Sequence, residues 1–219
     1  MNLKLTPEIA EMCGIVAGDG HLSRYISKKR TSYMLVIAGH KQDDKEYFQI
    51  LKELFQKSEV KLVDYEAKWG ELRSYSKHTL IFFEGLGIPV GRKSDIVRMP
   101  EWIKNDIILS CAFLRGVADT DFSLVFKSRK IKQSYPRITA DLKSKNMVDD
   151  ICNTLSKIGI NFAGPYLRNR KRNDSPCITY ELDINGHKNF ELWMKHIGFR
   201  NPKHLKKIKS PLPDSNFPV

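Results

Sequence analysis

Two similar stretches of sequence decide the fold: CGIVAGDGHL (residues 13–22) and RGVADTDFSL (residues 115–124). Glycine, aspartate and leucine recur in both at a constant offset of 102 residues, which aligns Gly14 with Gly116, Asp19 with Asp121 and Leu22 with Leu124. The same offset aligns Ala38 with Ala140 and Lys41 with Lys143. Such a repeat indicates two copies of one unit. We expect an N-terminal half (residues 1–100), a C-terminal half (residues 101–209) and a poorly ordered, proline-rich tail (residues 210–219).

Hydrophobic periodicity and turn residues predict the same order of elements in both copies. The first copy reads as helix 7–17, hairpin 19–38, helix 42–57, hairpin 60–76 and helix 77–85. The second reads as helix 104–118, strands 122–131 and 134–141, helix 144–158, strands 161–170 and 177–185, and helix 187–196. The expected class is therefore α+β, with an αββαββα order twice and antiparallel sheets.

The first helix of each copy carries small residues four positions apart on one face, namely Gly14 and Gly18, and Gly116 and Thr120. Small residues let two helix backbones approach closely, so we expect these helices to pack against each other. Asp19 and Asp121 would then emerge side by side at the C-terminal ends.

Two carboxylates at neighbouring helix C-termini are electrostatically unfavourable, because each C-terminus already carries partial negative charge. Either one acid is protonated or a cation lies between them. Hard divalent ions prefer carboxylate, carbonyl and water oxygens. The alternative is that each aspartate only turns the chain into its hairpin, but the repetition of Asp19 as Asp121 favours a metal site.

The chain is strongly basic, with 37 Lys and Arg against 25 Asp and Glu and a net charge of +12. Such a charge indicates a polyanionic partner, either nucleic acid or an anionic membrane surface. A membrane binder usually concentrates its charge on one amphipathic helix. Here the basic stretches 23–30, 125–132 and 167–172 fall in predicted strands, which favours nucleic acid over solvated lysines that protect sheet edges.

Composition also excludes several classes. The longest nearly uncharged apolar run, residues 107–114, is too short to span a bilayer. The first residues, MNLKLTPEIAEM, lack the pattern of a secretory signal peptide. The 4 cysteines are scattered, with no CxxC, which favours free thiols in a reducing compartment over a zinc ribbon or a disulfide framework. We expect an intracellular protein of the cytoplasm, nucleoid or organelle matrix, neither secreted nor bound to a membrane.

MCGIVAGDG (12–20) and LRGVADTDF (114–122) resemble the two motifs of a LAGLIDADG homing endonuclease of the two-motif, single-chain type. The resemblance extends over nearly the whole chain and includes GIPVGRKS (87–94) and GFRNPKHLKKI (198–208). It implies two pseudo-symmetric halves that meet at the motif helices. It further implies two saddle-shaped antiparallel sheets over the major groove of double-stranded DNA, formed by a monomer.

The resemblance also implies roles for individual residues. The acidic motif position falls on Asp19 and Asp121, and the preceding Gly18 and Thr120 would offer backbone carbonyls to the metal. The implied cofactor is Mg²⁺ or another divalent ion such as Mn²⁺, with Ca²⁺ as a non-catalytic substitute.

Three further polar residues correspond to supporting positions of the family. A basic residue that assists developing charge maps to Lys93, and less directly to Lys203. A water-positioning residue at the end of the second strand maps to His40, whose counterpart Leu142 is apolar. The alternative for all three is an ordinary surface residue near a turn. The last motif position is Gly20 in the first copy but Phe122 in the second, so Phe122 must enter its strand without positive φ or pack its ring against neighbouring structure.

Strand alternation predicts which side chains face DNA, because residues opposite the apolar positions share one face. These candidate base- and phosphate-contacting residues are Ser23, Tyr25, Ser27, Lys29, Glu71, Arg73, Lys127, Arg129, Tyr135, Arg137, Thr139, Arg168 and Arg170. Arginine pairs bidentately with guanine, and hydroxyl or carboxylate groups read other base edges.

The expected function is hydrolysis of one phosphodiester on each strand of a long, asymmetric DNA target. Two alternatives stay open on the sequence: a maturase that assists splicing of an intron RNA, and a catalytically inactive, sequence-specific DNA-binding protein.

Overall fold

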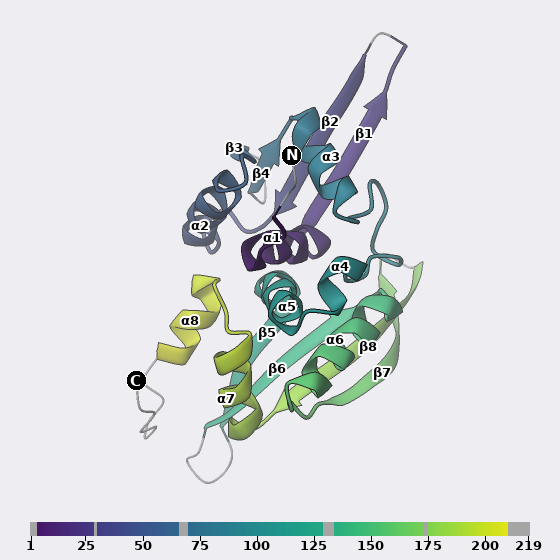
Figure 1. Cartoon of the computed structure of the whole chain (residues 1–219). Helices are drawn as coiled ribbons and strands as arrows, with labels where there is room; N and C mark the ends of the chain where they lie inside the picture. Colours follow the sequence, from purple (N-terminus) through teal and green to yellow (C-terminus); the bar gives the residue numbers. More distant parts are fainter. Residues whose placement is uncertain (1–3, 29, 66–69, 129–133, 173–174, 210–219) are drawn as a thin grey trace.

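The computed structural model describes residues 4–28, 30–65, 70–128, 134–172 and 175–209 (Figure 1). The protein is α+β and consists of two halves, each with a four-stranded antiparallel sheet. The strand orders are β1-β2-β4-β3 and β5-β6-β8-β7, so the second half repeats the topology of the first. The predicted fold class is confirmed, and the predicted tail, residues 210–219, lies outside the described residues.

The bounds of the elements follow the sequence prediction closely. The N-terminal elements are α1 (Pro7–Ala17), β1 (Gly20–Ile26), β2 (Thr31–Ala38), α2 (Lys45–Gln56), β3 (Val63–Tyr65), β4 (Glu71–Ser74) and α3 (Lys77–Gly85). The C-terminal elements are α4 (Glu101–Lys104), α5 (Ile107–Asp121), β5 (Phe122–Ser128), β6 (Ser134–Leu142), α6 (Lys145–Lys157), β7 (Ala163–Arg172), β8 (Ser175–Asn185), α7 (His187–His196) and α8 (Pro202–Lys209).

The predicted single helix over residues 104–118 is wrong in its bounds. Asp106 has extended backbone dihedrals, and its carboxylate accepts the N–H groups of Ile108 and Leu109, so it ends α4 and begins α5. Helix α5 then continues to Asp121. The sequence interpretation also missed α8, which begins at Pro202.

The constant offset of 102 residues does not hold beyond the first strand of each copy. Leu35 and Ile37 of β2 are buried, and the buried residues of β6 are Ile138 and Ala140, which are 103 positions later. One additional residue between β5 and β6 moves every following side chain by one position. The alignments of Ala38 with Ala140 and of Lys41 with Lys143 are therefore wrong.

On the corrected register, the position that corresponds to His40 is Lys143 and not the apolar Leu142. Both halves therefore carry a basic or titratable residue within two positions of the end of the second strand of their sheet.

Helices α1 and α5 pack against each other between the two sheets (Figure 1). A Cβ atom at Gly14 would overlap the carbonyl oxygen of Phe113, and one at Gly116 would overlap the carbonyl oxygen of Glu11. The close approach predicted from the small residues is thus confirmed, and it depends on the missing side chains of these two glycines.

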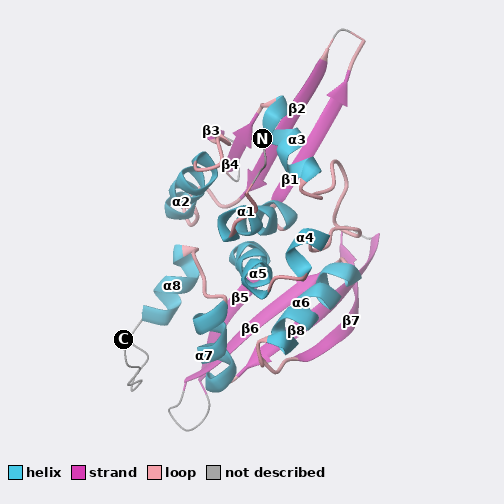
Figure 2. Ribbon diagram, viewed as in Figure 1, coloured by secondary structure: helices cyan, strands magenta, loops and turns pink. Residues whose placement is uncertain are grey.

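Each sheet is covered on one face by helices, and Figure 2 shows α6 and α7 over the second sheet. Leu22 and Leu124, the aligned leucines of the two copies, are both fully buried on this covered face. Buried and more exposed residues alternate along the strands. The more exposed residues therefore lie on the face of the sheet that the helices do not cover. Phe122 enters β5 with an ordinary negative φ, and its ring packs on Trp193 with centroids 5.8 Å apart. Phe122 therefore both avoids a positive φ and packs its ring against a neighbouring side chain.

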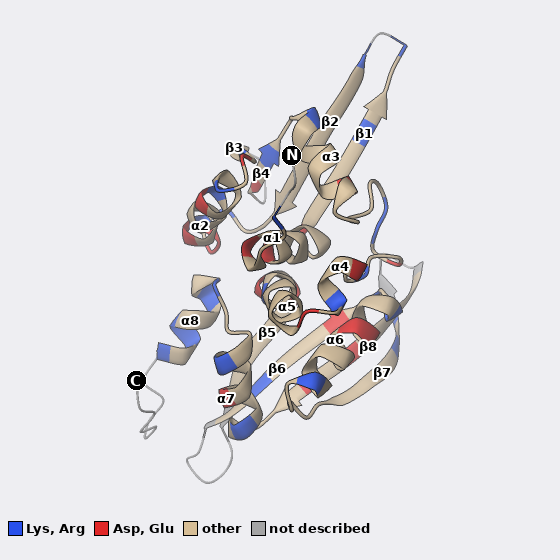
Figure 3. Cartoon of the chain, viewed as in Figure 1, with Lys and Arg blue, Asp and Glu red and all other residues tan. Residues whose placement is uncertain are grey.

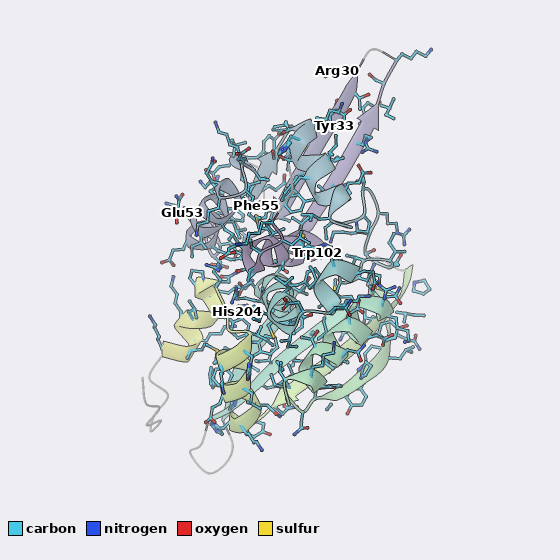
Figure 4. The ribbon with its side chains drawn as sticks, in the orientation of Figure 1. Arg30, Tyr33, Glu53, Phe55, Trp102 and His204 are labelled. Atoms are coloured by element: carbon cyan, nitrogen blue, oxygen red, sulfur yellow. The ribbon has the colours of Figure 1, made fainter. Side chains whose placement is uncertain are left out.

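A buried ion cluster joins the two halves beside the helix pair. Glu11 of α1 is fully buried and accepts hydrogen bonds from Arg115 at 2.7 Å and from Arg200 at 2.8 Å. Trp102 of α4 (Figure 4) adds a hydrogen bond of 3.0 Å from its Nε1 to the carbonyl of Leu86, which links α4 to the end of the first half. A buried carboxylate is costly unless it is paired, so Arg115 and Arg200 join α1 to α5 and to the segment before α8.

In the described part of the chain, no helix is long and apolar enough to cross a membrane. The 4 cysteines are free thiols; Cys13 and Cys111 are buried, as expected for buried free thiols, whereas Cys152 and Cys177 are only partly buried.

The acid sensitivity of the fold is expected to depend on His204 of α8 (Figure 4). Its ring is buried against Phe199, with centroids 4.4 Å apart, and neither ring nitrogen has a hydrogen-bond partner in the described residues. Burial lowers its pKa from 6.5 to about 3. The unfolded chain takes up a proton near pH 6.5 that the folded chain rejects, so stability falls as the pH drops from 6.5 toward 3.

At pH 5 this loss is about 2 kcal/mol. The variant His204→Phe should therefore lose less stability between pH 7 and pH 5 than the wild type, as measured by urea unfolding at both pH values. An equal loss in both proteins would show that other groups cause the acid sensitivity.

Candidate functional site

The C-terminal ends of α1 and α5 meet at the seam between the halves. Gly18 ends α1, Asp19 follows it directly, and Asp121 is the last residue of α5. A Cβ atom at Gly18 would lie 2.5 Å from Oδ2 of Asp121 and would overlap the hydroxyl of Thr120. The backbone of the first motif thus lies directly against the carboxylate of the second, as the sequence predicts.

The surroundings of both carboxyl groups oppose their ionisation. Burial and, second to it, the charge of Asp121 raise the pKa of Asp19 to about 7, against the opposite effect of Lys203 and Lys93. Asp121 keeps a solvent-accessible side, yet surrounding protein atoms raise its pKa, and Lys93, the hydroxyl of Thr120 and Lys203 act in the other direction. Without a bound cation, full ionisation of both carboxyl groups is therefore unfavourable.

Lys93 reaches the same point from the loop that follows α3. Its Nζ donates hydrogen bonds to the carbonyl oxygens of Ala17 and Gly18, the second at 2.6 Å. Burial lowers the pKa of this ammonium, whereas Asp121 and Asp19 raise it. Lys93 therefore lies where the two motif helices end. The Gly18 carbonyl, which the family resemblance assigns to a metal, accepts a hydrogen bond from Lys93 instead. Thr120 directs its hydroxyl back to the carbonyls of Gly116 and Val117.

The surroundings of the two acids differ. A cavity of about 230 Å³ opens beside Asp121 and is lined by Lys93, Asp141 and Lys143 among others. The cavity beside Asp19 measures only about 10 Å³ and is lined by Asp44, Tyr47, Asp119, Lys203 and neighbouring residues. The pseudo-symmetry of the helices therefore does not extend to the groups around them.

Two other candidates from the sequence are placed differently. Lys203, at the start of α8, lines the small cavity beside Asp19. His40 lies on the loop before α2, where its Nδ1 is 3.2 Å from a carboxylate oxygen of Asp43 and its side chain is half exposed. The residues that line the two cavities do not include His40.

Sequence reasoning missed the polar residues around Asp19. Oδ1 of Asp44 and the hydroxyl of Tyr47 are buried and lack a hydrogen-bond partner within the described residues. Asp119 accepts the backbone N–H groups of Arg200 and Asn201, and so anchors the segment before α8 to the helix pair. Comparison of the two copies did not single out Asp119, because the residue aligned with it in the first copy is Ala17.

The donor chemistry of the site fits a hard divalent ion. Two carboxylates and neighbouring backbone carbonyls offer oxygen only. The described residues contain no group of three or more His, Cys, Asp or Glu side chains arranged to hold a metal. Mg²⁺ is usually bound through one or two carboxylates, with waters and substrate phosphate oxygens as its other ligands. The oxygen donors of Asp19 and Asp121 fit the ligand chemistry of such an ion.

The candidate DNA-contacting residues of the first sheet lie opposite its core. Tyr25 is 70% exposed, on the face opposite Leu22. Arg73 pairs with Glu71 at 2.6 Å, and its guanidinium lies 3.3 Å above the ring of Tyr65. Ser23 shares this exposed face, whereas Ser27 hydrogen-bonds to the carbonyl of Arg30 in the turn. Lys29 and Arg129 lie outside the described residues, as does the side chain of Lys127.

The candidate residues of the second sheet face away from the core, and acids that the sequence reasoning missed accompany them. Tyr135, Arg137 and Thr139 alternate with buried positions of β6. Arg168 pairs with Glu181 at 2.7 Å, and Arg170 pairs with Asp141 at 2.7 Å. Figure 3 shows Lys and Arg in both halves and along α8. The outer face of the second sheet therefore carries arginines that are paired with carboxylates.

No protein-family model matches the chain. Among solved structures, the homing endonuclease I-DmoI is 19% identical with a TM-score of 0.61, over 88% of this chain and 95% of that chain. One structure of I-DmoI is in complex with DNA and Mn. The LAGLIDADG meganuclease I-AabMI, bound to uncleaved DNA, is 13% identical with a TM-score of 0.57, over 93% of this chain and 88% of that chain.

Three curated archaeal proteins match along nearly the whole chain. The replication factor C small subunit of Methanocaldococcus jannaschii is 26% identical over 95% of this chain, and the glutamine–fructose-6-phosphate aminotransferase of the same organism is 25% identical over 94%. The tRNA-splicing ligase RtcB of Methanopyrus kandleri is 23% identical over 87%. The chain spans only 10%, 17% and 20% of the length of these relatives.

The duplicated topology, the two motif helices packed through glycine, and the similarity to I-DmoI and I-AabMI agree with one another. The chain has the LAGLIDADG fold of the homing endonucleases.

Proposed function

We propose that the protein is a site-specific DNA endonuclease that cleaves both strands of a long, asymmetric duplex with the help of divalent metal ions. The observation that carries the proposal is the meeting of two acid-bearing helix ends under a lysine, at the seam between two sheets with polar outer faces. One chain contributes both acids, so a monomer suffices for double-strand cleavage.

The curated relatives support a mobile element as the source of this sequence. One stretch of about 209 residues matches within proteins that have three different named activities. A segment common to such proteins does not account for any of those activities. Movement of the segment between host sequences accounts for its distribution, and cleavage of the host DNA is the activity such movement requires.

In the proposed mechanism, Asp19 and Asp121 would hold the divalent ions. Such an ion supplies Lewis-acid polarisation of the phosphate and lowers the pKa of an attacking water. Lys93 fixes the end of α1 through the Ala17 and Gly18 carbonyls, and it places its ammonium beside Asp121. That fixed positive charge favours the additional negative charge of the pentacoordinate phosphate.

The variant Lys93→Met should lower the rate of cleavage about 100-fold or more while binding to the target changes only a few-fold, because the charge acts on the transition state. Single-turnover cleavage and DNA binding are measured on the same duplex. Lys145→Met, which removes an exposed lysine on α6, is the matched control and should cleave at the wild-type rate. Equal rates for both variants would place Lys93 outside the mechanism.

The proposal is tested by incubating the protein with a randomised duplex library, with and without Mg²⁺, and sequencing both the bound and the cut molecules. We expect enrichment of one long asymmetric site among the bound molecules, and double-strand cuts within it only with the ion. Bound but uncut DNA would identify a non-catalytic DNA-binding protein. No enrichment, together with stimulation of group I intron splicing by the purified protein, would identify a maturase.

A further inference from the structure

The outer face of the second sheet contains one arginine that is held much more firmly than the others. Arg137 of β6 and Asp183 of β8 lie diagonally across the strand pair, because the register places Thr139 opposite Asp183 and Arg137 opposite Asn185. Their neighbours Ile138 and Ile184 are buried in the core. Arg137 and Asp183 therefore share the face on which the proposed function places DNA.

The contact between these two residues is bidentate. Nε of Arg137 donates to Oδ1 of Asp183 at 2.9 Å, and Nη2 donates to Oδ2 at 2.6 Å. Two parallel hydrogen bonds of this kind fix both the position and the plane of a guanidinium. The side chain of Asp183 is 11% exposed and that of Arg137 is 24% exposed, so both are held by packing as well.

The other two paired arginines of this face are held less well. Arg168 donates Nε to Glu181 and is 49% exposed, and Arg170 lies 2.7 Å from Asp141 and is 55% exposed. Exposed ion pairs of this kind contribute little and rearrange easily. Arg137 is thus the arginine of the described face whose orientation is set before DNA arrives.

The placement of Asp183 requires a reason, because a carboxylate that faces a polyanion weakens binding to phosphate. The pair as a whole carries no net charge, so it adds little to the general attraction of DNA. An oriented pair contributes instead by selecting among bases.

The hydrogen bonds to Asp183 leave one edge of the Arg137 guanidinium, formed by Nη1 and Nη2, available for another contact. A guanidinium has five N–H protons, and Asp183 takes the one on Nε and one on Nη2. The remaining protons are on Nη1 and Nη2, and Oε1 of Glu181 lies 3.7 Å from Nη2, beyond hydrogen-bonding distance. Guanine presents two adjacent acceptors, N7 and O6, in the major groove, whereas adenine presents one acceptor and one donor. An arginine that offers two donors in a fixed plane therefore matches guanine.

We propose, on the basis of the function proposed above, that Asp183 is a positioning residue that presets Arg137 to read one guanine of the target. Asp183 itself touches no base. Arg137 makes the contact, and Asp183 determines its geometry.

The proposal is tested by selecting bound duplexes from a randomised library in the presence of Ca²⁺, for the wild type, Arg137→Ala, Asp183→Asn and the double variant. The wild type should show a strong guanine preference at one base pair. Arg137→Ala should lower that preference about tenfold or more. Asp183→Asn should lower it at the same base pair, because an amide cannot accept from both nitrogens of the guanidinium. The double variant should resemble Arg137→Ala.

Asp149→Asn is the matched control, because it removes one carboxylate from an exposed ion pair with Lys145 on α6, outside the sheet face. It should leave every base preference unchanged. Arg137→Lys keeps the charge but not the fork. It should weaken the guanine preference with total affinity retained, because the ammonium replaces two donors in a fixed plane by a single flexible group. Asp183→Glu serves if Asp183→Asn fails to fold: it keeps the charge but displaces the carboxylate, and should lower the preference at the same base pair.

Two results would overturn the proposal while the proposed function stands: an enriched target whose base preferences Asp183→Asn leaves unchanged, or a change confined to base pairs that Arg137→Ala does not affect. If the wild type itself enriches no target, the proposed function fails and the role of Asp183 fails with it.

Discussion

Replacement of Asp19 or Asp121 by asparagine is expected to abolish cleavage of both DNA strands while binding to the target persists. In the proposed function each carboxylate would be a metal ligand, and an amide is a much weaker ligand for Mg²⁺. The loss should be at least about 1,000-fold in single-turnover rate, because the ion and its water are removed from the reaction. Binding should persist because the residues of the two sheets, and not the acids, make most contacts with the duplex.

Unfolding is not the expected cause of the loss at Asp19. Burial and the charge of Asp121 already raise the pKa of Asp19 to about 7, so a neutral amide at this position relieves repulsion. Asp19→Asn should therefore be at least as stable as the wild type at pH 8 without metal. Asp149→Asn is the matched control for cleavage. Double-strand cleavage at the wild-type rate by either active-site variant would remove that acid from the mechanism.

Replacement of Gly14 by alanine is expected to destabilise the protein strongly, although the same change usually stabilises a helix. Alanine is about 1 kcal/mol better than glycine inside a helix. At Gly14, however, the added Cβ overlaps the carbonyl oxygen of Phe113 and lies 3.1 Å from the backbone nitrogen of Val117. These are backbone atoms that cannot rotate away, so α1 and α5 must separate.

Separation of the helices also weakens the contacts of Glu11 with Arg115 and Arg200, so the cost should reach about 3 kcal/mol or more. Gly85→Ala is the matched control, because no atom outside its own neighbours lies within 4 Å of a Cβ at this helical position. Urea unfolding should show a loss for Gly14→Ala and no loss for Gly85→Ala. A stabilised Gly14→Ala protein would contradict the packing of the motif helices described here.

The two cavities at the helix ends also differ in a way that the repeat does not predict. Asp121 faces an open space of about 230 Å³, whereas Asp19 faces one of about 10 Å³. The aligned motifs share the aspartate at this point, and residues of α2 and α8 line the small cavity beside Asp19. A duplicated motif therefore does not guarantee two equivalent reaction centres.

The sequence by itself determined the duplication, the order of the strands, the order of the helices apart from the break between α4 and α5 and apart from α8, and the pair of acids at the ends of the motif helices. These properties follow from local patterns: apolar periodicity, glycine spacing and the repeat of Asp19 as Asp121. The same patterns gave the outer faces of the strands, because side chains alternate regardless of what the sheet packs against.

The tertiary structure alone decided what surrounds those acids and which arginine is fixed. Lys93 lies 75 residues from the Gly18 carbonyl that it contacts, and Asp183 lies 46 residues from Arg137. The register of β6 likewise depends on one additional residue in a hairpin, which no periodic pattern reports. Contacts between distant residues are set by how helices and sheets pack around the glycine-lined seam, and a single sequence does not contain that geometry in any local window.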